Sequence, residues 1–435
     1  MVRGLSTFTR TPRQPGDRPP DPGAEHHRRP GQWCSACQIS LRGLTTRLLV
    51  DSPKPAGPDE PAHITATISV AMNSAARYDR RPRSLVGGCA LWFSGNHNAR
   101  RQGCWTPPEG ENALMTDAAV DIRERDIATN GVHLRIVEAG EPGQPAVILS
   151  HGFPELAYSW RHQIPALAAA GYHVIAPDQR GYGRSSMPAH IDDYNIEALS
   201  DDLLGILDDV GAGKATFVGH DWGAVVTWHT ALAVPERVSG VVGLSVPFTR
   251  RSQVPPTQAW NKLFGDNFFY ILYFQEPGVA DADLNRDPAT TMRRMMAGMA
   301  RIDGATMIAP GPAGFVERMP DPGELPEWLS QDELDHYITE FARTGFTGGL
   351  NWYRNFDRNW ALTERLADAN VVVPSLFIAG AADPVLGFTD HAGSVKYRTD
   401  NRGDLLIDGA GHWIQQERPL EVNAALLAFL QEVVH

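Results

Sequence analysis

The sequence predicts an α/β protein in which a mostly parallel sheet carries helices on both faces and a helical cap is inserted between two halves of the sheet. Short apolar strands alternate with helical stretches over residues 117–247, and the alternation resumes over residues 371–435. This rhythm is typical of a parallel sheet covered by helices. Residues 248–370 contain helical segments, aromatic residues and methionines without that alternation. A chain of 435 residues, 42% of them hydrophobic, is long enough for one large domain with such an insertion.

The first half of the core begins with a hairpin, because IRERDIATNGVHLRIVEAG places Asn130 and Gly131 between two extended runs. Further strands are expected at PAVILS, YHVIAPD, KATFVGH and SGVVGLSVP. The helices expected in this half are AYSWRHQIPALAAAG, EALSDDLLGILDDVG and WGAVVTWHTALAVPERV. The second of these helices has an apolar face made of Leu203, Ile206, Leu207 and Val210.

The second half of the core contains the strands VVVPSLFIAG and DLLIDGAGHW and ends with the helix PLEVNAALLAFLQEVV. The simplest account of residues 248–370 is an insertion that lies as a cap over the carboxyl ends of the strands, where open α/β sheets bind ligands. Four methionines in this segment follow helical spacing, and we interpret them as packing residues rather than ligands: Met292, Met295, Met296 and Met299.

Charge is unevenly distributed along the chain. Residues 1–114 hold 15 Lys+Arg and 9 Asp+Glu, a net charge of +6, whereas the rest holds 24 and 42, a net charge of −18. An acidic body argues against nucleic acid as the main partner, because neutralising phosphates requires a basic face. No apolar run has the length of a membrane span, and the start of the chain lacks the apolar stretch of a signal peptide. We therefore expect a cytoplasmic protein and leave a homodimer open.

Residues 1–116 are rich in Pro, Gly and Arg, which predicts a disordered, low-complexity extension. All four cysteines lie in this part, so no disulfide can form after Met115, as suits a reducing compartment. A zinc site is the alternative reading of these cysteines, but the last two are 15 residues apart, which fits metal-binding patterns poorly. Another hypothesis takes Met115 as the true start of the protein. The four cysteines are Cys34, Cys37, Cys89 and Cys104.

One short stretch raises the question of chemistry. Residues 217–226 read FVGHDWGAVV, which would contain Gly-x-Ser-x-Gly if a serine stood in place of Asp221. That motif is the sharp turn between a strand and a helix on which α/β-hydrolases mount their nucleophile. The stretch lies between an expected strand and an expected helix, as the motif requires. An aspartate flanked by glycines is also a common turn former, so Asp221 needs further support.

Two more residues stand in the chain order of an α/β-hydrolase, which is nucleophile, acid, histidine. Asp383 follows the strand SLFIAG and His412 follows the strand DLLI. The competing position for the acid, after VVGLSVP, reads FTRRS and contains no carboxylate. Each residue alone has an ordinary turn or loop explanation. Together they predict Asp221 as nucleophile, Asp383 as acid and His412 as base, with His220 as a structural neighbour.

A carboxylate nucleophile indicates alkyl transfer rather than acyl transfer. A serine that attacks a saturated carbon forms an ether, whereas Asp221 forms an ester whose carbonyl carbon water can attack. His412 would deprotonate that water while Asp383 holds the ring. The negative charge of the tetrahedral intermediate requires backbone N–H donors, which we expect from Trp222 and from Phe153 in HGFPE.

From Asp117 to its C-terminus the chain resembles the soluble epoxide hydrolases of the α/β-hydrolase fold, most closely the actinobacterial enzymes. The motifs that carry the resemblance are HGFPE, DQRGYGRSS, GHDWG, YFQEPG, GGLNWYRNFDRNW, the Asp383 loop and GAGHW. The resemblance implies hydrolysis of epoxides to diols without a metal or other cofactor, and a cis bond between Phe153 and Pro154. Residues 1–116 are too short for the phosphatase domain of the mammalian bifunctional members, so neither phosphatase activity nor a magnesium requirement is expected.

The resemblance also implies two cap tyrosines that bind the epoxide oxygen and donate to the developing alkoxide. These are Tyr353 in NWYRN and Tyr270 in NFFYILYFQEPG, with Tyr273 as the rival for the second role. A phenol is a suitable neutral donor at pH 7. An apolar pocket that favours lipophilic epoxides is expected from four aromatic residues, among which Phe269 and Trp352 are predicted to bind substrate. The four are Phe268, Phe269, Trp352 and Trp360.

Two other functions are alternatives at this stage. A haloalkane dehalogenase uses the same aspartyl ester on the same fold, and Trp222 is compatible with halide release. Phe153 after HG and the paired tyrosines fit an oxirane better. A non-catalytic ligand receptor on this fold is the second alternative, and a pure binder has no need of a water-activating pair such as Asp383 and His412.

Overall fold

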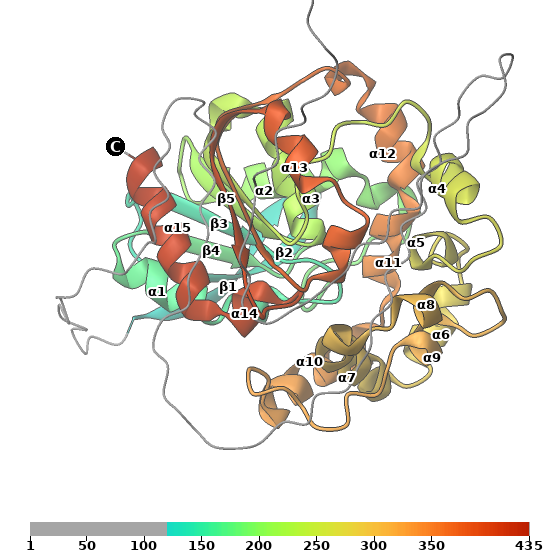
Figure 1. Ribbon diagram of the computed structural model, residues 1–435. Coiled ribbons are helices and arrows are strands. Elements are labelled where there is room, and N and C mark those ends of the chain that lie inside the picture. Colours follow the sequence, from blue (N-terminus) through green and yellow to red (C-terminus); the bar gives the residue numbers. More distant parts are fainter. Residues whose placement is uncertain (1–119, 435) are drawn as a thin grey trace, which may run out of the picture. The chain divides into compact units, whose positions relative to one another are not determined.

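The computed structural model describes residues 120–434, and within them eight strands form a single sheet (Figure 1). The strand order is β1-β2-β4-β3-β5-β6-β7-β8. The pairs β1–β2 and β2–β4 are antiparallel and all other neighbouring pairs are parallel, which confirms the mostly parallel sheet. The strands are β1 (Ile122–Thr129), β2 (Val132–Ala139), β3 (Ala146–Ser150), β4 (His173–Pro177), β5 (Ala215–His220), β6 (Val238–Leu244), β7 (Val371–Gly380) and β8 (Arg398–Ile407).

The expected hairpin is present between β1 and β2. Asn130 and Gly131 both have positive φ, 46° and 75°, as a two-residue turn between right-twisted strands requires. The Asn130 side chain donates to the Asp202 carboxylate at 3.0 Å and thereby ties the turn to helix α2 (Ile196–Asp209). The antiparallel edge of the sheet is therefore fixed to the parallel part by a side-chain contact as well as by strand pairing.

Helices cover both faces of the sheet, as predicted. α1 (Gln163–Ala169) and α15 (Pro419–Val433) pack on one face, and α2 and α3 (Trp222–Ala233) pack on the other (Figure 1). Each face has its own cluster of buried apolar side chains. The helix expected over residues 157–171 is divided into a 3₁₀ turn, η1 (Ala157–Trp160), and α1. Pro165 lies in the first turn of α1, where its missing N–H breaks no helical hydrogen bond.

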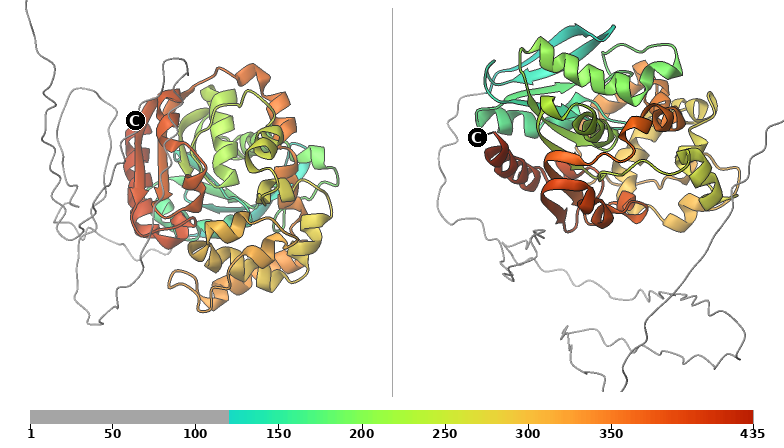
Figure 2. Two further views of the ribbon diagram at one scale, coloured as in Figure 1. Left: turned by 45° about the vertical axis from the view of Figure 1, so that its right-hand side comes forward. Right: turned by 90° about the horizontal axis from the view of Figure 1, so that it is seen from above.

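Residues 248–370, the predicted insertion, contain helices and no strand. The yellow to orange helices of the insertion gather on one side of the sheet (Figure 2). Met292, Met295 and Met296 are buried and Met299 packs against the same apolar cluster, which confirms their packing role. The helices are α4 (Pro256–Phe264), α5 (Tyr270–Tyr273), α6 (Val279–Asn285), α7 (Pro288–Gly298), α8 (Gly304–Ile308), α9 (Phe315–Arg318), α10 (Gln331–Thr344), α11 (Thr347–Arg354) and α12 (Phe356–Leu362).

Shorter helices complete the described part of the chain. Two α-helical turns lie in the second half of the core, α13 (His391–Ser394) and α14 (Ile414–Glu417). The remaining 3₁₀ turns are η2 (Ile191–Tyr194), η3 (Pro235–Arg237), η4 (Met299–Arg301), η5 (Glu364–Leu366), η6 (Pro384–Gly387) and η7 (Val395–Tyr397). Among residues 120–434 no helix combines the length and apolarity of a membrane span.

The predicted extension over residues 1–116 lies outside the described residues, and so do Met115 and the cysteine pattern. The division of the rest into residues 117–247, 248–370 and 371–435 stays a prediction. Within residues 120–434 no cluster of His, Cys, Asp or Glu side chains has the makeup of a metal site.

The terminal helix offers a direct test of the packing of the second apolar face. Leu426 on α15 is fully buried, whereas Leu420 on the same helix is 80% exposed. Leu426→Ala is expected to lower the free energy of unfolding by about 2–5 kcal/mol, because it removes buried methyl groups and leaves a cavity. The control Leu420→Ala should change it by less than about 0.5 kcal/mol. Urea denaturation of both variants gives the two values, and equal values would contradict the docking of α15.

Candidate active site

The parallel strands bring five residues to one edge of the sheet. β3 and β5 are neighbours, so the loop after β3 and the turn after β5 lie side by side at their carboxyl ends. β6, β7 and β8 follow in order across the sheet and end at the same edge. Open α/β sheets bind ligands at this edge. The five residues, one after each strand, are Phe153, Asp221, Ser245, Asp383 and His412.

Asp221 occupies a sharp turn between β5 and α3. Its backbone has φ 52° and ψ −119°, a conformation that L-residues rarely adopt. The flanking glycines are required by space, because a Cβ on Gly219 would collide with the backbone of Gly223. A Cβ on Gly223 would in turn collide with the carbonyl oxygen of Ser150. The Gly-x-Asp-x-Gly pattern is therefore the sequence signature of a turn that pushes the Asp221 side chain out beyond the sheet.

The Asp221 carboxylate is held by backbone donors. The Phe153 N–H donates to Oδ1 at 2.9 Å, and the Phe153–Pro154 peptide bond is cis, as the resemblance implied. Burial raises the pKa of the Asp221 carboxyl, while His412 and the N–H groups of Phe153 and Trp222 act against that rise. Both expected donors thus act on this carboxylate, with the Phe153 N–H on Oδ1, while Oδ2 lies toward His412.

His412 lies between the two carboxylates. Its Nδ1 donates to Asp383, at 3.0 Å from Oδ2 and 3.1 Å from Oδ1, and its Nε2 is 3.8 Å from Asp221 Oδ2. Burial lowers the pKa of the His412 imidazole, but the charges of Asp383 and Asp221 and the hydrogen bond to Asp383 outweigh it and raise that pKa to about 9. Burial also opposes ionisation of Asp383, yet His412 and the Val385 N–H lower the pKa of its carboxyl.

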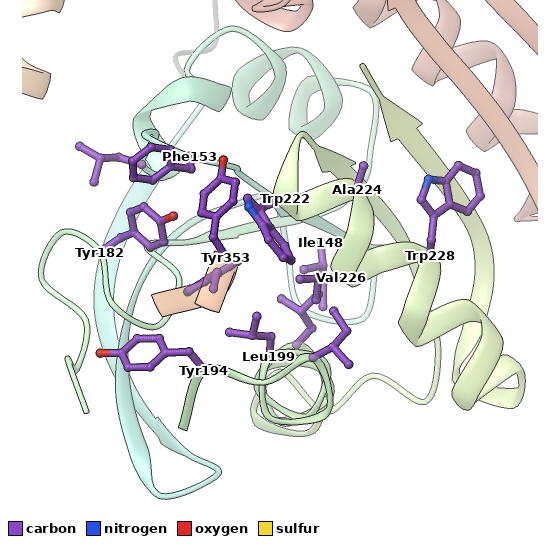
Figure 3. Packing of buried hydrophobic residues seen from close by; sticks show 14 of the residues in the cluster. Ile148, Phe153, Tyr182, Tyr194, Leu199, Trp222, Ala224, Val226, Trp228 and Tyr353 are labelled. Carbon is purple, nitrogen blue, oxygen red and sulfur yellow. The ribbon is translucent and has the colours of Figure 1, made fainter. Parts of the chain in front are cut away.

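Two tyrosines of residues 248–370 line the same cavity as Asp221. The Tyr353 ring lies beside Phe153 and Trp222, with centroid distances of 5.4 and 5.2 Å (Figure 3). The Tyr270 ring lies 6.1 Å from that of Tyr353. Burial and the negative charge of Asp221 raise the pKa of both phenols well above the ordinary value. Tyr273 instead donates to Asp283 at 3.3 Å.

A cavity of about 610 Å³ extends from the nucleophile between the core and the insertion. Asp221, Tyr270 and Tyr353 line it, and Phe269 and Trp360 are among its aromatic walls. Trp352 and Phe268, which were expected to line the pocket, do not.

The Trp352 indole is fully buried and donates to the Arg180 carbonyl at 3.1 Å. Its ring packs edge-on against the Trp222 ring, with a centroid distance of 5.9 Å. Trp352 therefore supports the cavity wall from behind and does not face the cavity. Phe268 lies under the Arg318 guanidinium at 4.1 Å. The substrate contact predicted for Trp352 is therefore corrected to a supporting contact.

Residues 145–419 match the family model described as the alpha/beta hydrolase fold. Over 311 residues the chain is 65% identical to epoxide hydrolase A of Mycobacterium tuberculosis, a match that covers 71% of this chain and 97% of that protein. The crystal structure of epoxide hydrolase A from Mycobacterium thermoresistibile superposes with a TM-score of 0.70 at 63% identity, covering 72% of this chain and 98% of the other. The chain belongs to the epoxide hydrolases of the α/β-hydrolase fold.

A mouse relative, bifunctional epoxide hydrolase 2, is 39% identical, and the match covers 70% of this chain and 54% of the mouse protein. The resemblance to the actinobacterial epoxide hydrolases is thus confirmed. The haloalkane dehalogenase alternative loses its basis, because the family relationship now rests on long matches as well as on local motifs.

Behind the triad, this epoxide hydrolase carries a buried network that sequence reasoning missed. His220 Nδ1 donates to Glu155 Oε2 at 2.6 Å, and His220 Nε2 donates to the His412 carbonyl at 2.8 Å. Ser245 Oγ donates to the same carbonyl at 2.8 Å. Both nitrogens of the His220 ring are thus engaged, which agrees with the structural role expected for it. The network fixes the backbone of His412 just as Asp383 fixes its side chain.

Glu155 is the final residue of HGFPE and has no solvent exposure. Its Oε1 accepts from Gln415 at 2.8 Å and Gln416 at 3.1 Å, and its Oε2 accepts from the Gly152 N–H at 3.0 Å. Burial favours its protonated form, but the charge and hydrogen bond of His220 and the Gly152 N–H lower the pKa of Glu155 to about 2. The only sequence signal for this role was a glutamate inside an otherwise apolar motif.

Replacing Glu155 tests the network through pH. Because its folded-state pKa lies near 2 and its ordinary value is 4.5, the charged carboxylate stabilises the fold above pH 4.5 and loses this effect as the pH falls toward 2. Glu155→Gln is expected to cost about 3–5 kcal/mol near neutral pH, because it leaves His220 without its buried partner. Urea unfolding from pH 7 down to pH 3 should show the gap to wild type narrowing, and a constant gap would contradict the ion pair.

Proposed function

We propose that this epoxide hydrolase converts lipophilic epoxides to vicinal diols through an ester of Asp221. The observation that supports this proposal most directly is that the two carboxylate oxygens of Asp221 have different neighbours. Oδ1 accepts from the Phe153 N–H at 2.9 Å, whereas Oδ2 lies 3.8 Å from the Nε2 of His412 and is left free to attack.

In the first step, Oδ2 of Asp221 attacks an oxirane carbon from the cavity side, and the carbon–oxygen bond of the ring breaks. Tyr353 and Tyr270 donate hydrogen bonds to the leaving oxygen and one of them transfers its proton to the alkoxide. The raised pKa of both phenols keeps them protonated and able to donate at neutral pH. Burial beside Asp221 therefore suits them as neutral acids rather than as anions.

In the second step, water attacks the carbonyl carbon of the ester, and His412 takes the proton. A His412 pKa near 9 describes the resting site, where Asp221 is charged. Esterification removes that charge, so the pKa of His412 falls at the stage at which the ring must act as a base. Negative charge then develops on Oδ1, which already accepts from the Phe153 N–H, and the Trp222 N–H is the second donor to this group. Collapse of the intermediate breaks the bond between the carbonyl carbon and Oδ2, which leaves as a hydroxyl oxygen of the diol and takes the proton from His412. The Asp221 carboxylate keeps the water oxygen, and the second water proton returns to the deprotonated tyrosine.

The cavity supports the substrate class. Its walls include Phe269, Trp260, Phe356 and Trp360, which bury apolar substrate groups. Residues 248–370 act in this scheme as a cap that supplies the tyrosines and closes the pocket. We also propose a cytoplasmic location for the protein, because its body has no cysteine, and fractionation of the native host would check it.

Trapping the ester tests the role of Asp221. His412→Gln removes the base for the second step only, so hydrolysis of the ester should slow by about 10²–10⁴-fold while its formation continues. Mass spectrometry should find one substrate mass added to the peptide that contains Asp221. In wild type, one turnover in heavy-oxygen water should leave the label in the Asp221 carboxylate. A carboxylate without label, or turnover by Asp221→Ala, would exclude the ester mechanism.

The tyrosine roles have a matched control three residues away. Tyr353→Phe and Tyr270→Phe should each slow ester formation by about 10²-fold or more, because each loses a donor to the leaving oxygen. Tyr273→Phe removes a hydroxyl of the same helix that contacts Asp283 instead, so it should change the rate by less than about threefold. Rapid-quench measurement of the single-turnover rate gives all three values. A loss in Tyr273→Phe as large as in Tyr270→Phe would reverse the assignment.

A further inference from the structure

One face of helix α3 forms a wall of the cavity. Five of its residues after Asp221 line the space, and they fall within one arc of the helix at 100° per residue: Trp222, Val225, Trp228, His229 and Leu232. At a rise of 1.5 Å per residue, the cavity follows the helix for about 16 Å from the nucleophile. The cavity therefore has a long arm that runs beside α3.

His229 is the titratable residue on this wall. It is 7% exposed, and within residues 120–434 its ring has no hydrogen-bond partner, although it lines the cavity. The neighbouring Trp228 differs in this respect, because its indole N–H donates to the Val246 carbonyl at 3.1 Å. The His229 ring nitrogens are not among the fully buried unpartnered atoms of residues 120–434, so they are accessible from the cavity and can pair with a polar group that enters it.

Other buried histidines of the chain show what a purely structural role looks like. His220 engages both ring nitrogens, with Glu155 and the His412 carbonyl. His173 donates to Glu138 at 2.6 Å. Neither of them lines the cavity. His229 therefore differs from both in its free ring nitrogens and in the surface that it faces.

Asn359 provides a second polar group on the arm. Its Oδ1 accepts from the Ile196 N–H at 2.8 Å, while its Nδ2 has no partner among the described residues. Ile196 and Asn359 both line the cavity. Glu197, the next residue after Ile196, is close enough for its charge to act on His229. Helix α2 contacts both α3 and α12, so the free amide of Asn359 and the free ring of His229 lie on two helices that share α2 as a neighbour and line the same cavity.

The charge state of His229 limits what it can bind. Burial lowers the pKa of its imidazole to about 4, with Glu197 opposing and Arg365 adding to the decrease. At neutral pH the ring is therefore uncharged and offers one donor and one acceptor. A neutral ring near Glu197 suits a hydroxyl or carbonyl oxygen and does not suit a carboxylate.

We propose that His229, with the Asn359 amide, is a specificity-determining site that binds a neutral oxygen substituent of the substrate at the far end of the arm. The proposal rests on the epoxide hydrolase function proposed above. His229 lies eight residues beyond Asp221, about 12 Å along the helix axis. With carbon–carbon bonds of about 1.5 Å in a zigzag chain, this corresponds to about ten bonds between the oxirane and the oxygen. The preferred substrates are thus long-chain epoxides with a remote hydroxyl or carbonyl group.

The test compares terminal epoxides of about twelve carbons, a length set by the arm, that end in a methyl, a hydroxyl or a carboxylate group. Wild type is expected to favour the hydroxyl over the methyl substrate by about three- to tenfold in kcat/KM, the range for one neutral hydrogen bond. The difference should lie in KM, because the remote contact is the same in ground and transition states. The same comparison on six-carbon chains should give a ratio near one, because the hydroxyl cannot reach the site.

Three variants assign the preference to His229. His229→Phe should abolish the hydroxyl-to-methyl ratio, and His229→Gln should keep part of it, because an amide retains a donor and an acceptor. His133→Phe changes an exposed histidine on β2 and should keep the full ratio. If His229→Phe does not fold, the chain-length series in wild type still decides the question.

Three results would overturn the inference. They are equal kcat/KM for the twelve-carbon hydroxyl and methyl substrates, a preference for the carboxylate, and an unchanged ratio in His229→Phe. None of these would affect the proposed function, provided that wild type hydrolyses the methyl-terminated epoxides. Absence of diol from every epoxide would instead contradict the proposed function itself.

Discussion

The site depends on one crowded turn, in which Asp221 is forced into positive φ between two close backbone approaches. Gly219 has no room for a side chain against Gly223, and Gly223 has none against Ser150. The turn therefore presses β3 and β5 together, and this contact brings the Phe153 N–H within 2.9 Å of the Asp221 carboxylate. An anion receptor made of backbone amides cannot be moved by a side-chain rotamer, so its position relative to the nucleophile is set by the sheet itself.

The two carboxyl groups of the site differ in the direction in which their pKa is shifted. Partial burial raises the pKa of the Asp221 carboxyl, whereas Asp383 accepts from His412 and the Val385 N–H and the pKa of its carboxyl is lowered. One carboxylate is thus left reactive and the other remains an anion that orients the imidazole. His412 is held twice, through its ring by Asp383 and through its carbonyl by Ser245 and His220. In the proposed mechanism, loss of the Asp221 charge on esterification changes the basicity of His412 while both of these anchors remain.

The sequence predicts the site residues that follow directly after a strand, and it misses those whose role depends on a partner far away in the chain. Asp221, Asp383 and His412 each follow a strand, and in a parallel sheet strand ends converge, so order along the chain was enough to place them at one edge. Glu155 was missed because its partner His220 lies 65 residues away and no periodicity marks it. Trp352 was predicted to line the pocket because it is an aromatic residue next to Tyr353. The sequence is the same whether such a side chain faces the substrate or packs behind the pocket wall. The distinction depends on side-chain direction, which composition and spacing do not contain.

Side-chain direction was also missing from the prediction of α3, whose sequence indicates only an ordinary apolar helix. One side of α3 packs on the sheet and another lines the cavity, and sequence spacing alone does not tell which side faces the cavity. The sheet supplies the proposed nucleophile, triad and anion receptor, and the position of each of these depends on strand register. The insertion supplies the tyrosines and most of the walls. Substrate preference can therefore change through the insertion and the cavity face of α3, at residues such as His229 and Asn359, while the chemistry at the strand ends stays as it is.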